Sequence, residues 1–151
     1  MTREQLRGAI TPELDVSDLE TSLRFYVELL GFEVSFTRPE EKFAYLLVNG
    51  AGFMLEEIGA GRSFHSAPLE RPYGRGVNFQ IRVEDVGQLQ RRLQAAAIPF
   101  VIPLEERWYR NGEEERGNRQ FVVADPDGYL LRFFEDLGTR AHRSDEPAGD
   151  E

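Results

Sequence analysis

Hydrophobic and polar residues alternate and then recur at helical spacing, and this order of patterns occurs twice along the chain. Residues 10–16 alternate and predict a strand that has Leu14 and Val16 on one face. Ser17 and Glu20 have the spacing of a capping box and mark the start of a helix. The helix carries one apolar stripe, formed by Leu19, Ser22, Leu23, Tyr26, Leu29 and Leu30. Three β-rich segments follow, at 32–37, 43–48 and 53–58.

The second half repeats this order. Residues 77–83 alternate, and a helical stripe comes next, formed by Val86, Leu89, Leu93, Ala96 and Ala97. A strand is predicted at 100–104, and 105–119 is predicted to be a long polar loop that contains Trp108 and Tyr109. Residues 120–135 predict a hairpin whose turn is Asp125-Pro126-Asp127-Gly128, since proline presets φ and glycine tolerates positive φ.

The two halves also share a short motif before each helix. The motif is apolar-x-Val-x-Asp-apolar, at 14–19 and again at 81–86. We therefore expect an α+β fold of two tandem βαβββ modules, at about 10–58 and 77–135. The modules should form a curved mixed sheet with a concave ligand cleft and with helices on the outside.

The remaining segments are assigned by composition. The Gly- and Pro-rich segment 59–76 is the predicted linker between the modules, and its His65 is expected to be exposed to solvent. A single domain should then span 1–136. The polar segment 137–151 is expected to be disordered.

Composition narrows the classes of function. The net charge of −9 argues against nucleic acid as a partner and favours a cationic ligand. The chain has no cysteine, so thiol catalysis and cysteine-ligated zinc are excluded. No signal-peptide pattern or membrane-spanning apolar run is present, and we expect a cytoplasmic protein.

Arg132 stands in the middle of an otherwise apolar strand. Leu131 and Phe133 point to one face of this strand and Arg132 to the other. The arginine is either a surface guanidinium on a half-solvated sheet or a functional group inside the cleft.

Two segments resemble the signatures of the vicinal oxygen chelate superfamily, which includes glyoxalase I, extradiol dioxygenases and bleomycin-resistance proteins. Residues 14–19 with Ser22, Phe25 and Tyr26, followed by Leu30-Gly31-Phe32, resemble its opening signature. Asp125-Pro126-Asp127-Gly128 and Leu131-Arg132-Phe133 resemble its closing signature. The resemblance spans about 10–136 and is more specific for fold than for function.

The resemblance implies four positions for metal ligands, and here they read Thr11, Glu56, Asn78 and Arg132. Arginine stays protonated and cannot donate a lone pair, and Thr and Asn are weak ligands for transition metals. We therefore expect no metal and no other cofactor. Our hypothesis is that Glu56 and Arg132 form an ion pair where the metal would lie; the alternative is that they occupy separate cavities.

Without a Lewis acid, a histidine base or a cysteine nucleophile on the sheet, the sequence gives no catalytic set, and the expected function leans away from an enzyme. The resemblance then points to the metal-free bleomycin-resistance proteins, which are acidic homodimers that sequester a large cationic antibiotic in clefts between subunits. The expected ligand-binding residues are Phe36, Tyr45, Met54, Glu56, Asn78, Trp108, Tyr109, Arg132 and Phe134. Core burial is an equal alternative for Phe36 and Tyr45.

Two other functions stay open. One is a metal-dependent glyoxalase- or dioxygenase-type lyase or oxidoreductase whose ligands lie elsewhere in the chain. The other is a superfamily domain that binds an unrelated metabolite.

Overall fold

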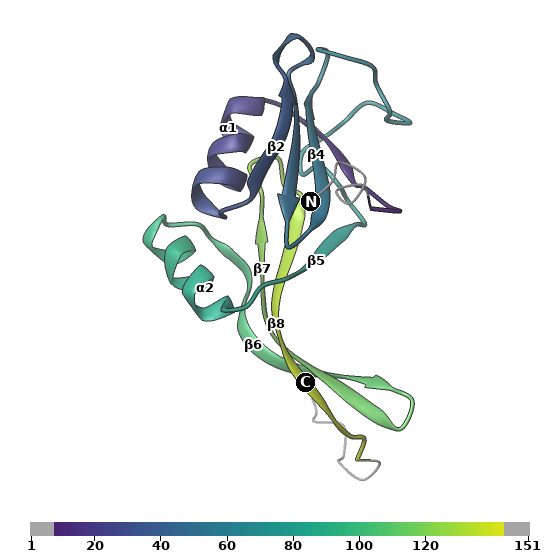
Figure 1. Ribbon diagram of the computed structural model, residues 1–151, viewed down its shortest axis with the longest axis vertical. Coiled ribbons are helices and arrows are strands. Elements are labelled where there is room, and N and C mark those ends of the chain that lie inside the picture. Colours follow the sequence, from purple (N-terminus) through teal and green to yellow (C-terminus); the bar gives the residue numbers. More distant parts are fainter. Residues whose placement is uncertain (1–7, 144–151) are drawn as a thin grey trace.

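A computed structural model describes residues 8–143. Residues 1–7 and residues 144–151 of the predicted tail lie outside this range. Within it, the two halves of the chain form two modules whose helices lie on the same side of the molecule (Figure 1). No helix among the described residues is long and apolar enough to cross a membrane.

The first module forms a four-stranded mixed sheet, here called the first sheet, in the order β1-β4-β3-β2. Strand β1 is parallel to β4, and the other neighbours are antiparallel. Its elements are β1 (Glu13–Val16), α1 (Leu19–Leu23), a π-helix (Arg24–Leu29), β2 (Glu33–Arg38), a 3-10 turn (Pro39–Glu41), β3 (Phe43–Val48) and β4 (Ala51–Glu57).

The second module forms a second sheet with the equivalent order, β5-β8-β7-β6. Its elements are β5 (Asn78–Arg82), α2 (Val86–Ala95), β6 (Phe100–Asn111), β7 (Glu114–Ala124) and β8 (Leu130–Ala141). The predicted α+β class with two βαβββ modules is confirmed. The strands form two hydrogen-bonded sheets rather than one continuous sheet.

Both helices begin at the aspartate of the repeated motif. The Asp18 carboxylate accepts a hydrogen bond from the backbone N–H of Thr21, and the Asp85 carboxylate accepts one from Gln88. Asp18 is therefore the N-cap, one residue after the predicted Ser17. Each cap satisfies one of the N–H groups that lack a partner in the first helical turn.

The predicted loop at 105–119 is wrong, because these residues form most of β6 and the start of β7. The predicted disorder is also wrong for 137–141, which continue β8. The three strands extend from the body of the molecule as an arm, here defined as 105–119 with 135–141 (Figure 1). Polar pairs rather than apolar alternation stabilise it: Arg140 Nε lies 2.7 Å from Glu115 Oε1 and its guanidinium lies 4.1 Å from the Trp108 ring.

The turn at 125–128 joins the second module to the first. Tyr26 is fully buried and donates a 2.7 Å hydrogen bond to Asp125 Oδ2, and Tyr129 donates one of 2.9 Å to the carbonyl of Asp15. Asp127 accepts a hydrogen bond from the backbone N–H of Ser17. The φ of Gly128 is +98°, the positive value that the sequence pattern predicts for this turn.

An equivalent contact joins a turn of the first module to the second module. The side chain of Asn49, at the β3–β4 turn, donates a hydrogen bond to the carbonyl of Arg82. Asp15 and Arg82 occupy the same place in the repeated motif. Each module therefore places its last turn against the end of the other module's first strand, as expected for a duplicated unit.

Candidate ligand-binding cavity

The first sheet has an open face made of two rows of side chains across its four strands. One row is Phe36, Tyr45, Met54 and Glu13, and the next is Arg38, Phe43, Glu56 and Asp15. Phe36 stacks on Tyr45 with ring centroids 5.1 Å apart and planes at 17°, and the Arg38 guanidinium lies 3.9 Å from the centre of the Phe43 ring. Phe36 is 45% exposed, whereas Tyr45 is buried.

Glu56 is buried on this face and is partnered by a second carboxyl group. Its side chain hydrogen-bonds Glu13, and the linker residue Gly61 lies so close that a Cβ there would be 2.0 Å from Glu56 Oε1. Burial raises the pKa of Glu13, and the negative charge of Glu56 raises it further.

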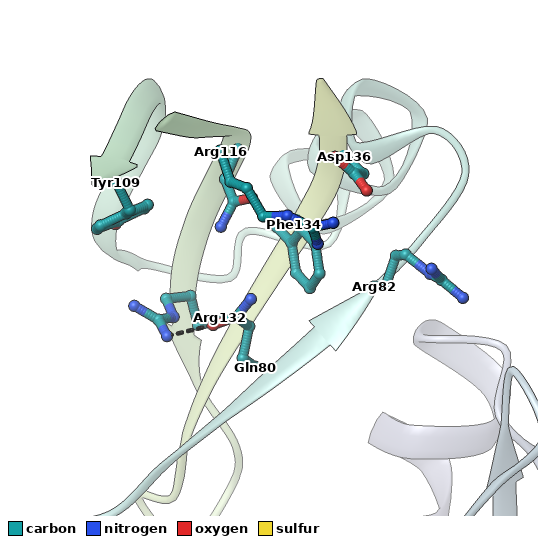
Figure 2. A pocket seen from close by; sticks show the side chains of 8 residues that line it. Gln80, Arg82, Tyr109, Arg116, Arg132, Phe134 and Asp136 are labelled. Carbon is teal, nitrogen blue, oxygen red and sulfur yellow. Dashed lines mark hydrogen bonds between the residues drawn. The ribbon is translucent and has the colours of Figure 1, made fainter. Parts of the chain in front are cut away.

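A cavity of about 290 Å³ (Figure 2) opens on the face of the second sheet opposite to the buried Leu131 and Phe133. It lies near the lower end of the size range of small-molecule sites. All four strands of the second sheet contribute to it. Its lining residues are Gln80, Arg82, Tyr109, Arg116, Asn118, Arg132, Phe134 and Asp136.

Arg132 lines this cavity because the strand alternation of β8 turns it away from the core. Its neighbours Leu131 and Phe133 are fully buried on the opposite face. Its Nη2 donates a 2.5 Å hydrogen bond to Gln80 Oε1 (Figure 2). Its Nε is buried and has no hydrogen-bond partner within residues 8–143. A buried donor without a partner costs free energy and indicates a place where another molecule can bind.

The hypothesis of an ion pair between Glu56 and Arg132 is wrong for this chain. Glu56 belongs to β4 of the first sheet and pairs with Glu13, whereas Arg132 belongs to β8 of the second sheet and pairs with Gln80. The two side chains occupy separate environments, as the alternative stated.

Tyr109 and Trp108 are consecutive strand residues and therefore lie on opposite faces of β6. Tyr109 lines the cavity, and its hydroxyl accepts a 2.6 Å hydrogen bond from Gln120. Trp108 lies on the other face, over Gly117 and beside Arg140, and does not line the cavity. Of the two residues that the predicted loop was expected to present together, only Tyr109 joins Arg132 and Phe134.

Asn78 and the first-sheet residues lie outside the cavity. Asn78 is exposed and pairs with Leu130 at the start of β5. Phe36, Tyr45, Met54 and Glu56 form part of the open face of the first sheet. His65 lies in an exposed part of the linker, as predicted, although its Nδ1 is 3.1 Å from Asp15 Oδ2.

Sequence reasoning missed five of the lining residues. Gln80 and Arg82 lie on the polar face of an alternating strand, and that pattern could have identified them. Arg116 and Asn118 fell in the segment predicted to be a loop, and Asp136 lies one residue beyond the predicted hairpin.

The positions implied for a metal do not fit one. Thr11 precedes β1, Glu56 is engaged by a second carboxyl group, and Asn78 and Arg132 belong to the other sheet. An amide, a hydroxyl and a permanent cation are a poor donor set for a divalent transition metal. Within residues 8–143 no three His, Cys, Asp or Glu side chains are grouped so that they could hold a metal ion.

Comparisons with known proteins give one consistent family. Residues 11–133 match the family described as Glyoxalase/Bleomycin resistance protein/Dioxygenase superfamily. A bleomycin resistance protein from Geobacillus stearothermophilus is 27% identical over 83% of this chain and 95% of its own length.

Solved structures share the fold at lower identity. TioX from Micromonospora sp. ML1 is 23% identical, with a TM-score of 0.65 and coverage of 87% of this chain and 100% of that chain. A lactoylglutathione lyase from Agrobacterium tumefaciens is 19% identical, with a TM-score of 0.57 and coverage of 85% and 92%. Proteins with unrelated names therefore share this fold, and the fold alone does not identify a function.

Proposed function

The chain belongs to the Glyoxalase/Bleomycin resistance protein/Dioxygenase superfamily, and we propose that it is a non-catalytic binding protein that sequesters an aromatic small molecule. One observation carries this proposal. The cavity of the second sheet combines two aromatic side chains, Tyr109 and Phe134, with the partnerless Nε of Arg132. Aromatic walls with a few oriented polar groups are typical of small-molecule sites.

The residues of the cavity favour binding over catalysis. Asp136 is the one carboxylate that lines it, and no histidine or cysteine does. Asp136 accepts a hydrogen bond from the backbone N–H of Gly138. The residues at the expected metal positions do not form a ligand set. The cavity therefore contains no evident general base or nucleophile and no evident site for a Lewis acid.

A bleomycin-like antibiotic is the second, more specific candidate for the ligand. It is favoured by the similarity to a protein named bleomycin resistance protein and by the open face of the first sheet. That face places the carboxyl groups of Glu13 and Glu56 beside Phe36 and Met54, which suits a cationic ligand that carries planar rings. We propose that two chains form a homodimer and that the ligand lies in clefts between them.

Calorimetric titration with bleomycin tests the candidate ligand. We expect micromolar or tighter binding, and mass spectrometry of the recovered ligand should show it unchanged. Phe36→Ala should weaken binding by about 1–2 kcal/mol if its ring, which is exposed on the face of the first sheet, contacts the ligand. Phe64→Ala is the matched control, because Phe64 is an exposed phenylalanine in the linker.

Each result has a clear meaning. A chemically altered ligand would favour the enzymatic alternative, and absent binding would remove bleomycin while leaving other aromatic ligands to be tested. Native mass spectrometry should give about twice the 17.3 kDa chain mass, and a monomer at all concentrations would contradict the homodimer.

A further inference from the structure

The arginines of the cavity lack the carboxylate partner that several other arginines of the chain have. Arg38, Arg71 and Arg140 each lie within 3.0 Å of a carboxylate oxygen. Arg82 and Arg116, by contrast, make no side-chain hydrogen bond or ion pair within residues 8–143. With Arg132, the lining has three arginines and one aspartate, Asp136, and so a net charge of +2.

This local charge is opposite to that of the whole chain. The sequence has 27 acidic and 18 basic residues, so an acidic neighbour is on average easy to find. Three guanidinium groups around one cavity repel one another unless an anion lies between them. The local excess is also opposite to what a cationic ligand would need.

Arg132 has donors left for an anion. Gln80 orients the guanidinium through Nη2, while Nε has no partner and Nη1 makes no hydrogen bond within residues 8–143. A hydrogen bond from a guanidinium N–H to a carboxylate oxygen is charge-assisted and about twice as strong as one between neutral groups. The Gln80 hydrogen bond restrains the side chain before a ligand arrives, which lowers the entropic cost of binding.

The aromatic residues define the other half of the ligand. Tyr109 is held by the hydrogen bond that its hydroxyl accepts from Gln120, and Phe134 projects from β8 into the same cavity (Figure 2). Arg132 and Phe134 are two residues apart on one strand and so point to the same side, within reach of one small molecule.

We propose that this cavity binds an aromatic carboxylate, with Arg132 and Arg116 at the carboxylate and with Tyr109 and Phe134 against the ring. Arg82 lies at the rim and adds long-range attraction for the anion. This inference rests on the proposed function of small-molecule binding and specifies the chemical class of the ligand at this cavity.

Three probes of one shape but different charge test the proposal by calorimetry: 2-naphthoate, the neutral 2-naphthamide and the cationic 2-naphthylmethylammonium. We expect 2-naphthoate to bind at least about tenfold more tightly than the other two. Its affinity should fall as NaCl is raised from about 50 to 500 mM.

Variants assign the effect to the arginines. Arg116→Gln and Arg132→Gln should each weaken 2-naphthoate binding by about tenfold without a comparable change for 2-naphthamide. Arg116 is exposed, so its replacement tests the proposal even if the Arg132 variant does not fold. Arg24→Gln is the matched control, because Arg24 is exposed on the first module and should leave binding unchanged.

Equal or tighter binding of the neutral or cationic probe would overturn the anion class and leave the proposed binding function standing. Unchanged 2-naphthoate affinity in both arginine variants would also overturn it. If none of the three probes binds up to its solubility limit, both the inference and the assignment of binding to this cavity fail.

Discussion

Buried polar side chains carry much of the specificity of this structure at the scale of single residues. Asp125 shows this best: burial raises the pKa of its carboxyl, and hydrogen bonds from Tyr26 and from two backbone N–H groups oppose the rise. The same burial, with the nearby Asp125 charge, raises the pKa of Tyr26 well above its usual value. The tyrosine therefore stays protonated and remains a donor.

Removing this donor should destabilise the protein. Tyr26→Phe leaves Asp125 Oδ2 buried without its partner, and we expect the free energy of unfolding to fall by about 1–3 kcal/mol. Urea unfolding followed by circular dichroism measures the change. Tyr73→Phe is the control, since the Tyr73 hydroxyl makes no hydrogen bond within residues 8–143; an equal loss in both variants would contradict the role of the Asp125 contact.

The carboxyl pair of Glu13 and Glu56 predicts a pH dependence. A carboxyl whose folded pKa exceeds its unfolded pKa binds its proton more tightly in the folded state. It therefore stabilises the fold at low pH, and this contribution is lost as pH rises from the usual value of 4.5 through the raised pKa of Glu13.

Replacing Glu13 by Gln should remove this loss. We expect Glu13→Gln to raise the free energy of unfolding at pH 7 by less than about 1 kcal/mol, because Glu13 is partly exposed to solvent. The difference from the parent protein should shrink near pH 4, where Glu13 is itself protonated. Glu33→Gln, at an exposed position on β2, should show no such trend; a pH-independent difference for Glu13→Gln would refute the explanation.

At the scale of elements, the body of each module was predictable and the arm was not. Core strands such as β3, β4 and the start of β8 carry apolar residues that must be buried, so their pattern identifies them. The arm is solvated on both faces, and its strands are held by contacts such as Glu115 with Arg140. A pairing between residues 25 positions apart leaves no local hydrophobic pattern.

The same limit explains the outcome for the candidate site. Arg132 was identified because an arginine is unusual in an apolar strand, and Tyr109 because an aromatic residue is unusual in a polar segment. Phe134 was chosen as an aromatic residue that could stack on a ligand. Trp108 was grouped with Tyr109 on the assumption of a loop; as strand neighbours they face opposite ways. Arg116 and Asn118 could be identified only once β7 was known to pair with β6, which places Arg116 opposite Tyr109.

The arm contains a tight contact that can be tested. The Trp108 ring lies over Gly117, and a Cβ at that position would be 2.7–2.8 Å from three ring atoms. Gly117→Ala should therefore displace the indole, shift the tryptophan emission and cost about 1–3 kcal/mol. Trp108 is the one tryptophan in the sequence, so the emission reports this contact directly.

Thr139→Ala is the control for that measurement, because Thr139 is exposed on the neighbouring strand. An unchanged emission spectrum in Gly117→Ala would mean that the indole does not lie against Gly117 in solution.

At the scale of the whole molecule, the modules are joined by hydrogen bonds at both turns and by a shared core. Phe53 of the first module contacts Phe79 of the second, with ring centroids 5.6 Å apart. Arg71, from the linker, donates hydrogen bonds to Asp127 and Ser17 and so contacts both modules. These contacts should make the two modules unfold together.

Urea unfolding tests that cooperativity with two probes. Trp108 emission reports the second module, whereas far-ultraviolet circular dichroism reports both, and we expect the two curves to coincide. Asp127→Ala should lower the midpoint of both curves together, because it removes the acceptor of Arg71 and of the Ser17 N–H. A separation of the two curves would show that each module unfolds alone.

The reciprocal contacts of the two turns have a consequence for the covalent link between the modules. Asn49 reaches the carbonyl of Arg82, and Tyr129 reaches that of Asp15, so each half holds the other without help from residues 61–68, which are exposed. A protease cut within that stretch should leave two fragments that stay associated and co-elute. The linker therefore connects two modules that already bind each other, as the two subunits of a dimer do.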